Sequence, residues 1–371
     1  MSYYKLPKIN YIIDVNPHSS RNDASTPYMS FSLFKYYNNL KTQIDTCLNN
    51  SDCLYNFDTI THMLNPYAYI YSLVPGYNYS VSKLESKNEL FYDFIEIFSS
   101  FNMFENLNEN LINILHITPN HLESIESINF IKKTTIIQNI YFNNINDDVL
   151  KSINGSRFDF CIFETNNDTL ELYIQSFIEI VMVILKYQMT GGNTIIKINH
   201  LFYKPILDII YLICSLFNTV YIIKPNTSND ASFDKYLVCK NFLLDDTKKT
   251  QFKTNYYKLL IFLKKLEGKN ITSIIDFNMP YYFTSKLNDI NIIIGQQQLE
   301  YFDQIISILK NKNKEDKIET IKKTAIQKCV NWCEKYKIPY NKFNEKTNIF
   351  LPLTKGIQEI SEIQEINDFM L

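Results

Sequence analysis

Three charged residues lie at or near the ends of short apolar segments in the middle of the chain. Glu164 ends the run FDFCIFE, Lys197 lies within NTIIKIN, and Asp234 comes just before KYLVCKNF. Runs of this length and composition predict buried β-strands. In an open α/β sheet, ligands bind beyond the carboxyl ends of the strands, so one lysine and two carboxylates could converge on one rim.

A lysine in such a place has two chemical states open to it. Nearby carboxylates would hold Lys197 charged, whereas desolvation or a second lysine would lower its pKa. With a lowered pKa it could act as a general base on a hydroxyl group. The alternatives are structural: Lys197 at the sheet edge with its ammonium reaching water, and Glu164 and Asp234 as helix N-cap or turn residues.

The elements that must position these residues alternate along the chain between short apolar runs and longer segments with helical spacing. Strands are expected at residues 111–117, 135–142, 158–164, 193–199, 219–223 and 235–242, and helices at 87–104, 170–188 and 204–217. This alternation predicts an α/β fold of Rossmann-like type, with a mostly parallel sheet and helices on both faces.

The flanking regions have different patterns. Residues 1–65 mix aromatic and polar clusters without clear periodicity and predict an irregular N-terminal extension, so the α/β domain is placed at residues 66–245. Residues 246–371 predict a mainly helical region, with helices at 296–309 and 317–335. The lysine run at 310–317 is interpreted as a solvated linker in preference to an RNA-backbone contact, because acidic residues are interspersed in it.

Composition limits the classes of function. The 37 basic and 39 acidic residues nearly balance, so any nucleic-acid contact must come from a local basic patch. No segment has the uninterrupted apolar length of a signal peptide or membrane span, which predicts a protein that is not secreted and not in a membrane. The seven cysteines, among them Cys47, Cys53, Cys329 and Cys333, have no zinc-site spacing and are expected to be reduced thiols.

Four sequence elements follow one another between residues 190 and 242. They are the pair Gly191 and Gly192, Lys197 in the strand that follows, KPNTS at 224–228, and SFDKYLVC at 232–239. This order and spacing resembles the C-terminal half of FtsJ-like (RrmJ-type) ribose 2′-O-methyltransferases, most closely the Adrift-type cap-specific branch. In that family a glycine pair opens a strand bearing the catalytic lysine, and a KP-x-TS element precedes a short strand.

The resemblance implies a set of four charged catalytic residues. SVSKLES places Lys83 as the first lysine, Glu164 stands where the family has aspartate, and Asp234 stands where it has glutamate, around Lys197. It also implies the reaction: S-adenosylmethionine gives its methyl group to a ribose 2′-hydroxyl, Lys197 accepts or polarises the hydroxyl proton, and no metal is needed. Misplacement of a catalytic group by about 1 Å can reduce the rate about 100-fold. The exchange of Asp for Glu and of Glu for Asp is therefore compatible with activity but does not by itself predict it.

The family's cofactor loop is rich in proline and glycine, because the backbone must closely approach the methionine part of S-adenosylmethionine. The corresponding segment here, residues 115–129, contains no glycine and has His121 and Leu122 at the Pro-Gly positions. A leucine there is expected to narrow the methionine pocket. The resemblance places cofactor contacts at Thr118, Asn120, Leu122 and Glu164.

Two functions remain open, and a third interpretation is that only ancestry is shared. The first is a methyltransferase that acts on RNA at a capped 5′ end, and the retained lysines and the KPNTS element favour it. The alternative is a catalytically inactive methyltransferase fold that serves as an RNA-binding or scaffold subunit, for which the glycine-free loop speaks. Either would act in the cytoplasm, or packaged in a virion if the chain is viral, and could join a protein partner in a transcription or capping assembly.

Overall fold

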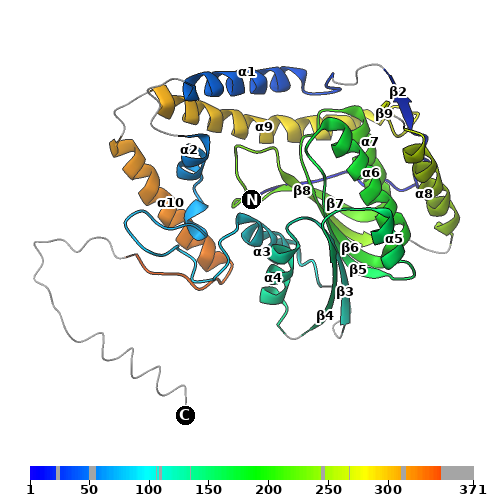
Figure 1. Ribbon diagram of the computed structural model, residues 1–371, viewed down its shortest axis with the longest axis horizontal. Coiled ribbons are helices and arrows are strands. Elements are labelled where there is room, and N and C mark those ends of the chain that lie inside the picture. Colours follow the sequence, from blue (N-terminus) through cyan, green and yellow to red (C-terminus); the bar gives the residue numbers. More distant parts are fainter. Residues whose placement is uncertain are drawn as a thin grey trace, which may run out of the picture.

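The computed structural model describes residues 1–21, 26–49, 56–105, 107, 111–133, 135–243, 247–266, 268–310 and 315–343. Within them, a seven-stranded sheet with the order β1-β7-β8-β6-β5-β3-β4 forms the centre of the molecule (Figure 1). Its strands are β1 (Ser2–Lys5), β3 (Leu111–Ile117), β4 (Ile136–Phe142), β5 (Phe158–Glu164), β6 (Gln188–Ile198), β7 (Phe217–Lys224) and β8 (Lys235–Phe242). A second sheet pairs β2 (His18–Ser20) with β9 (Asn270–Ser273).

Strand direction decides which residues meet at each edge of the large sheet. β4, β3, β5 and β6 are parallel neighbours, and β8 runs antiparallel to both β6 and β7. β7 therefore has the direction of β6, and β8 begins at the edge where β5 and β6 end. The prediction of an α/β fold with a mostly parallel sheet is confirmed, and the arrangement is compatible with a Rossmann-like fold.

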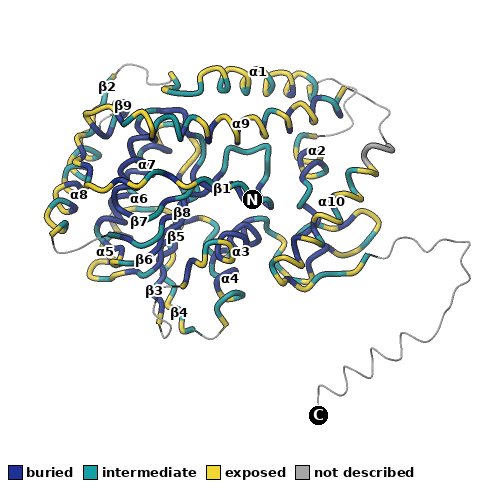
Figure 2. The backbone as a smooth tube through the Cα atoms, turned by 180° about the vertical axis from the view of Figure 1, so that it is seen from behind, coloured by how far each residue is buried: buried dark blue, intermediate teal, exposed yellow. Residues whose placement is uncertain are grey.

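Helices cover both faces of this sheet, as predicted. On one face lie α6 (Leu170–Tyr187) and α7 (Lys204–Leu216), which share a core with Cys161 and Phe163 of β5. On the other lie α3 (Glu89–Phe101) and α4 (His121–Ile131), which share a core with Phe160 of β5. Because successive residues of a strand point to opposite faces, a strand covered on both sides is apolar throughout, which is why FDFCIFE lacks polar alternation. Figure 2 shows this buried centre.

The glycine pair lies inside β6, because the strand begins at Gln188 and not at residue 193 as expected. The register with β5 shifts there: Phe158 pairs with Gln188, whereas Phe160 pairs with Asn193. Gly191 has a φ of +79°, which L side chains rarely adopt, and a Cβ at Gly192 would lie 2.6 Å from the backbone oxygen of Asp159. Both glycines are therefore required by the backbone of this bulge.

Residues 1–65, expected to be irregular, contribute regular elements to the structure. β1 pairs antiparallel with β7, β2 pairs with β9, and α1 (Phe31–Leu48) packs along α9 (Tyr281–Lys310), with α2 (Phe57–Leu64) nearby (Figure 1). The strands and the helix with which they pair lie beyond residue 216, and Phe34 of α1 also packs on Phe202, so local periodicity gives no sign of these contacts. Cys53 lies outside the described residues.

The C-terminal region is mainly helical, with α8 (Lys249–Lys264), α9 and α10 (Glu315–Lys335). α10 packs against η1 (Ala68–Ile70) and α3, and buries the free thiols of Cys329 and Cys333 next to Trp332. The remaining helix, α5 (Asp147–Ser152), precedes β5. Among the described helices, none is both long and apolar enough to cross a membrane.

Candidate functional site

Glu164, Lys197 and Asp234 meet at the carboxyl edge of the sheet, and we call these three residues the lysine cluster. The Lys197 Nζ atom lies 2.9 Å from Glu164 Oε1 and 3.5 Å from Asp234 Oδ2. Two features of the sheet bring them together: Glu164 pairs in register with Lys197, and the reversed β8 begins beside them directly after Asp234. Their side chains keep 14%, 15% and 27% exposure, in chain order, so solvent still reaches the cluster.

The two carboxylates fix the charge of Lys197. Burial by itself would lower the pKa of this lysine, but the charges of Asp234 and Glu164 more than offset burial, and the pKa is raised above its ordinary value. Lys197 is therefore an ammonium at neutral pH. Of the two chemical states open to it from the sequence, the structure favours the charged one, which donates hydrogen bonds and stabilises negative charge.

Glu164 also ties the cluster to the loop that follows β3. Its Oε2 atom accepts hydrogen bonds from Thr118 Oγ1 at 2.7 Å and from Asn120 Nδ2 at 3.1 Å. Thr118 is buried, and its hydroxyl oxygen accepts from the backbone N–H of Asn120 at 3.1 Å. Three of the four residues expected to contact a cofactor are thus brought together with Lys197. The fourth, Leu122, is 63% exposed in the first turn of α4 and does not fill the interior of the site.

The β3–α4 loop, residues 118–120, turns without glycine. No residue between 115 and 129 has a positive φ, so the backbone demands no glycine there. The Thr118 hydroxyl closes the turn by binding the Asn120 N–H, as Ser and Thr side chains commonly do at loop and helix starts. The ring of His121 stacks on Tyr141, with centroids 4.5 Å apart and 9° between the planes.

His116 in β3 supports this loop from inside. Its Nδ1 atom lies 2.7 Å from Ser124 Oγ on α4, and its Nε2 atom lies 2.9 Å from Asn139 Oδ1 on β4. Burial lowers the pKa of this histidine to about 4, so the ring is neutral at physiological pH. Each ring nitrogen has a neutral partner, and the contacts join β3, β4 and α4.

Two buried lysines that the sequence reasoning missed hold the segment around Asp234. Lys224 Nζ donates to the backbone oxygen atoms of Asn229, Ser232 and Asp234, at 2.8, 3.0 and 2.9 Å. Burial lowers its pKa. The sequence indicates that this lysine is buried, because it ends an apolar strand and precedes proline, but it does not indicate which acceptors the ammonium meets.

Lys235 is the second of these lysines. Its Nζ atom donates to the backbone oxygen of Asn199 at 2.8 Å and of Phe233 at 2.6 Å. Burial, followed by the charge of Lys224, lowers its pKa to about 7. Asn199 in turn donates from Nδ2 to Asp234 Oδ1 at 3.2 Å. The position of the Asp234 carboxylate is therefore fixed through both its backbone and its side chain.

Two carboxyl groups of α3 lie beneath the cluster. Burial raises the pKa of Glu89, which accepts a hydrogen bond from Tyr71 at 3.2 Å and is partly stabilised by the charges of Lys224 and Lys197. Burial also raises the pKa of Asp93, which accepts from the Tyr236 hydroxyl at 2.9 Å and bonds to Thr227 of the KPNTS segment. α3 is thereby fastened to the loop that carries Asp234.

Lys83, the fourth expected catalytic residue, is placed differently. Its side chain is exposed, and within the described part of the chain it makes no contact with the lysine cluster. The segment around it is bound to the end of the chain's helical region: the Lys83 N–H donates to Pro339 O at 2.9 Å, and Asn341 N–H donates to Val81 O at 2.8 Å. The structure thus brings together three of the four residues.

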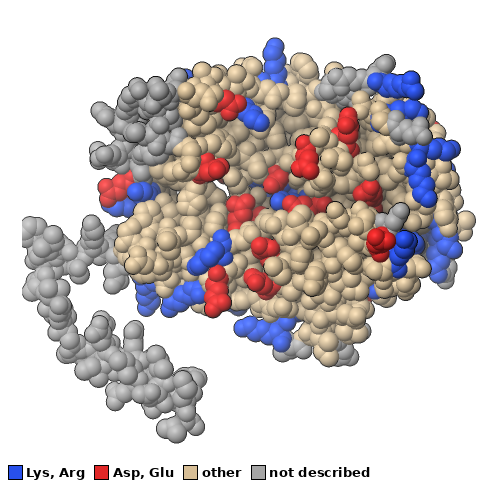
Figure 3. Space-filling model, in the orientation of Figure 1, with Lys and Arg blue, Asp and Glu red and all other residues tan. Residues whose placement is uncertain are grey.

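One face of the molecule has an acidic hollow (Figure 3). Figure 3 shows acidic side chains gathered around the hollowed centre of one face, with few basic side chains among them. In the described residues, no three His, Cys, Asp or Glu side chains are arranged to hold a metal ion. An incoming nucleic acid would meet repulsion here unless positive charge were supplied.

The fold and the cluster define an α/β protein with a mixed, mostly parallel sheet and a lysine held between two carboxylates at its carboxyl edge. No family model matches the chain. It is 25% identical over 293 residues to the "Uncharacterized protein R383" of Acanthamoeba polyphaga mimivirus, covering 76% of this chain and 74% of that one. A "Putative hemolysin from Streptococcus thermophilus" is similar in structure at 10% identity and a TM-score of 0.24, covering 47% of this chain and 75% of the other.

Proposed function

We propose that the chain is an S-adenosylmethionine-dependent RNA ribose 2′-O-methyltransferase that acts at a capped 5′ end. The observation that carries the proposal is the lysine cluster: Lys197 lies 2.9 Å from Glu164 and 3.5 Å from Asp234 at the edge where an α/β sheet binds ligands. The strand that bears Lys197 also contains a glycine pair ahead of the lysine, and in the family that the sequence resembles such a pair opens the strand.

The cluster has the groups that a hydroxyl nucleophile needs. The Lys197 ammonium can donate a hydrogen bond to the ribose oxygen and stabilise the negative charge that develops on it. The hydroxyl proton then passes to a carboxylate, and Asp234 is the more exposed of the two. Glu164 and Asp234 keep Lys197 charged and oriented. Either Asp or Glu can fill this role, so the exchange of the two acids relative to the family is compatible with it.

The residues of the β3–α4 loop fit the methionine part of S-adenosylmethionine, which when bound supplies an electrophilic methyl group. The Glu164 carboxylate suits an ammonium group, and the Asn120 amide with the first N–H groups of α4 suits a carboxylate. The Leu122 side chain is 63% exposed, so it does not itself occupy the interior of the site. Thr118 holds the loop in place through its buried hydroxyl.

A second candidate is a catalytically inactive scaffold or RNA-binding subunit. The observation that favours it is the saturation of Glu164: one carboxylate oxygen binds Lys197, and the other binds both Thr118 and Asn120. A cofactor must replace some of these bonds to gain the loop's polar groups, which reduces its net binding energy. Either protein would work in the cytoplasm or in a virion, in company with transcription or capping proteins.

Calorimetric titration of the full chain with S-adenosylmethionine and S-adenosylhomocysteine separates the two candidates. Binding, together with methyl transfer to capped RNA that is lost with a 2′-deoxy acceptor and in Lys197→Ala, would establish the enzyme. A matched control is Lys258→Ala, because Lys258 lies on α8 and pairs with Asp14, outside the lysine cluster. If neither S-adenosylmethionine nor S-adenosylhomocysteine gives heat at millimolar concentration, the methyltransferase proposal is overturned and the scaffold or RNA-binding function remains.

A further inference from the structure

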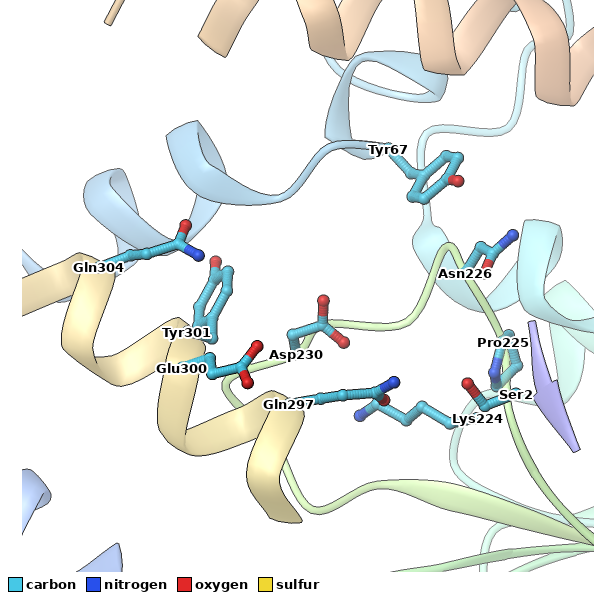
Figure 4. A pocket seen from close by; sticks show the side chains of 10 residues that line it. All are labelled: Ser2, Tyr67, Lys224, Pro225, Asn226, Asp230, Gln297, Glu300, Tyr301 and Gln304. Carbon is cyan, nitrogen blue, oxygen red and sulfur yellow. The ribbon is translucent and has the colours of Figure 1, made fainter. Parts of the chain in front are cut away.

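A cavity of about 310 Å³ opens between α9 and the segment that joins β7 to β8 (Figure 4). Its walls carry Asp230 from this segment, Glu300 and Gln297 from α9, Tyr67 from the turn before η1, and Lys224. The walls thus combine two carboxylates, a lysine, amide side chains and aromatic rings. This volume equals the share of liquid taken by about ten water molecules, enough for a small organic ligand.

Asp230 is a half-buried carboxylate without a protein partner. It forms no hydrogen bond or ion pair within the part of the chain that the structure describes, and Figure 4 shows its oxygen atoms directed into the cavity. Glu300 projects toward the same space from α9, and one of its oxygens accepts from Gln296 at 3.1 Å. A partly desolvated carboxylate without a partner is unfavourable, so a ligand that carries positive charge would relieve it.

The cations near Asp230 are engaged elsewhere or remain apart. The Lys224 ammonium donates hydrogen bonds to three backbone oxygen atoms, and the Met1 amino group lies 3.6 Å from Glu96. Lys328 is exposed on α10 and forms no ion pair with Asp230. The charges of Lys224, the Met1 amino group and Lys328 act on Asp230 from a distance, and none of them forms an ion pair with it in the described residues, so its oxygen atoms stay open to a ligand in the cavity.

Tyr67 supplies the other half of a cation site. Its ring faces the carboxylates across the cavity in Figure 4, and its hydroxyl has no hydrogen-bond partner among the described residues. An aromatic face attracts an ammonium and also packs against methylene groups. Both walls are preformed, because Gln298 donates to Ala231 O at 2.9 Å and the Tyr301 hydroxyl donates to Thr61 O at 2.6 Å.

We propose that this cavity binds an aliphatic polyamine of about the size of spermidine. One ammonium group binds Asp230, a second binds Glu300, and the methylene chain between them packs on Tyr67. A bare metal ion is the poorer fit, because two carboxylates on separate elements do not form the dense oxygen cage that Ca²⁺ or Mg²⁺ requires. This binding goes beyond the proposed function and does not depend on methyl transfer. It would place positive charge on the segment whose other end carries Asp234.

Isothermal titration of the full chain with spermidine tests the proposal. We expect one site per chain, with affinity reduced about tenfold or more in Asp230→Asn, which keeps the shape of the side chain but removes its charge. Tyr67→Leu should weaken binding about threefold through the lost ring. The matched control is Asp303→Asn, since Asp303 is exposed on α9 outside the cavity lining and should leave affinity within about twofold.

Two results would overturn the polyamine site. One is equal affinity in Asp230→Asn and the parent chain, when thermal unfolding shows both to be folded. The other is complete loss of spermidine binding in MgCl₂ of matched ionic strength, which would show attraction to the acidic surface alone. The uncharged 1,6-hexanediol should give no heat, and binding of it equal to that of spermidine would contradict the role of charge.

Discussion

The lysine cluster and the β3–α4 loop lie side by side but are built on different principles. The cluster depends on charge, with Lys197 between two carboxylates, and the strand that carries Lys197 contains, closer to its start, a glycine pair that its backbone requires. The loop has no glycine and no positive φ, and the Thr118 hydroxyl closes its turn. The comparison shows that the lack of glycine in the β3–α4 loop reflects a turn closed by a side-chain hydrogen bond, with no residue at positive φ. Glu164 belongs to both regions and couples them.

The strongest test of this contrast is Lys197→Met. Loss of the ammonium should reduce kcat for methyl transfer by about 10² to 10⁴, because Lys197 is the group proposed to bind and stabilise the nucleophilic oxygen, with KM for RNA little changed. Steady-state assays with capped RNA measure both quantities. Lys258→Met is the control and should keep its rate. An unchanged kcat in Lys197→Met would place the cluster among purely structural ion pairs.

The next largest effect is expected for Gly192→Ala, which tests whether the glycine pair is a backbone requirement. The new Cβ would lie 2.6 Å from Asp159 O and 2.9 Å from Met189 O, both backbone atoms that cannot turn aside. Urea denaturation should show a loss of about 2 to 4 kcal/mol in unfolding free energy. Gly76→Ala, at a φ of +88° in open space, should cost only about 1 kcal/mol. Equal costs would contradict the steric argument.

The pH dependence of stability tests the support of the loop. His116 has a pKa of about 4 in the folded chain against 6.5 ordinarily, so the unfolded chain takes up the proton first as pH falls. Its stabilisation is complete above pH 6.5 and is lost progressively down to pH 4, amounting to about 2 kcal/mol between pH 7.5 and 5. His116→Gln should remove this part of the pH-dependent loss of stability, which chemical denaturation at both pH values would measure. The pKa of His200 is also lowered to about 4, so the variant should keep the part of the pH dependence that comes from His200.

The smallest effect is expected for Thr118→Val, which cuts the link from the loop to Glu164. The substitution keeps the volume of a buried side chain and removes one hydrogen-bond donor and acceptor, at a cost of about 1 to 2 kcal/mol. Chemical denaturation measures it. Thr254→Val, where an exposed hydroxyl bonds only to Thr250 O in α8, should change stability by less than about 0.5 kcal/mol. Equal effects would mean that the loop and the cluster are not coupled.

The sequence predicted the inner strands of the sheet because they are mostly buried on both faces. β3, β5 and β8 begin and end at the predicted residues, since a continuous apolar run needs no knowledge of its partner. Elements that depend on distant partners escaped prediction. β1 is four residues long, and α1 buries only Ile44 fully, so neither carries a local signal. β6 also began earlier than expected, because a bulge with glycine resembles a turn in sequence.

For the site, residue type and strand ends predicted the three members of the lysine cluster, and the parallel arrangement explains why they meet. Lys83 was not placed with them, because pairing of its backbone with Pro339 depends on residues more than two hundred positions away. The buried supports Lys224 and Lys235 were missed for another reason. Their acceptors are backbone oxygen atoms, which every residue offers and no sequence distinguishes.

The pairing of β1 with β7 has a consequence for how the chain folds during synthesis. Ser2 meets Lys224, so the first strand must wait on the ribosome for more than two hundred further residues. At the usual 5 to 20 residues per second, this delay is about ten to forty seconds. β2 and α1 wait longer still, for β9 and α9. These segments are therefore made well before their partners and are among the last to fold, and in that interval they are open to chaperones and proteases.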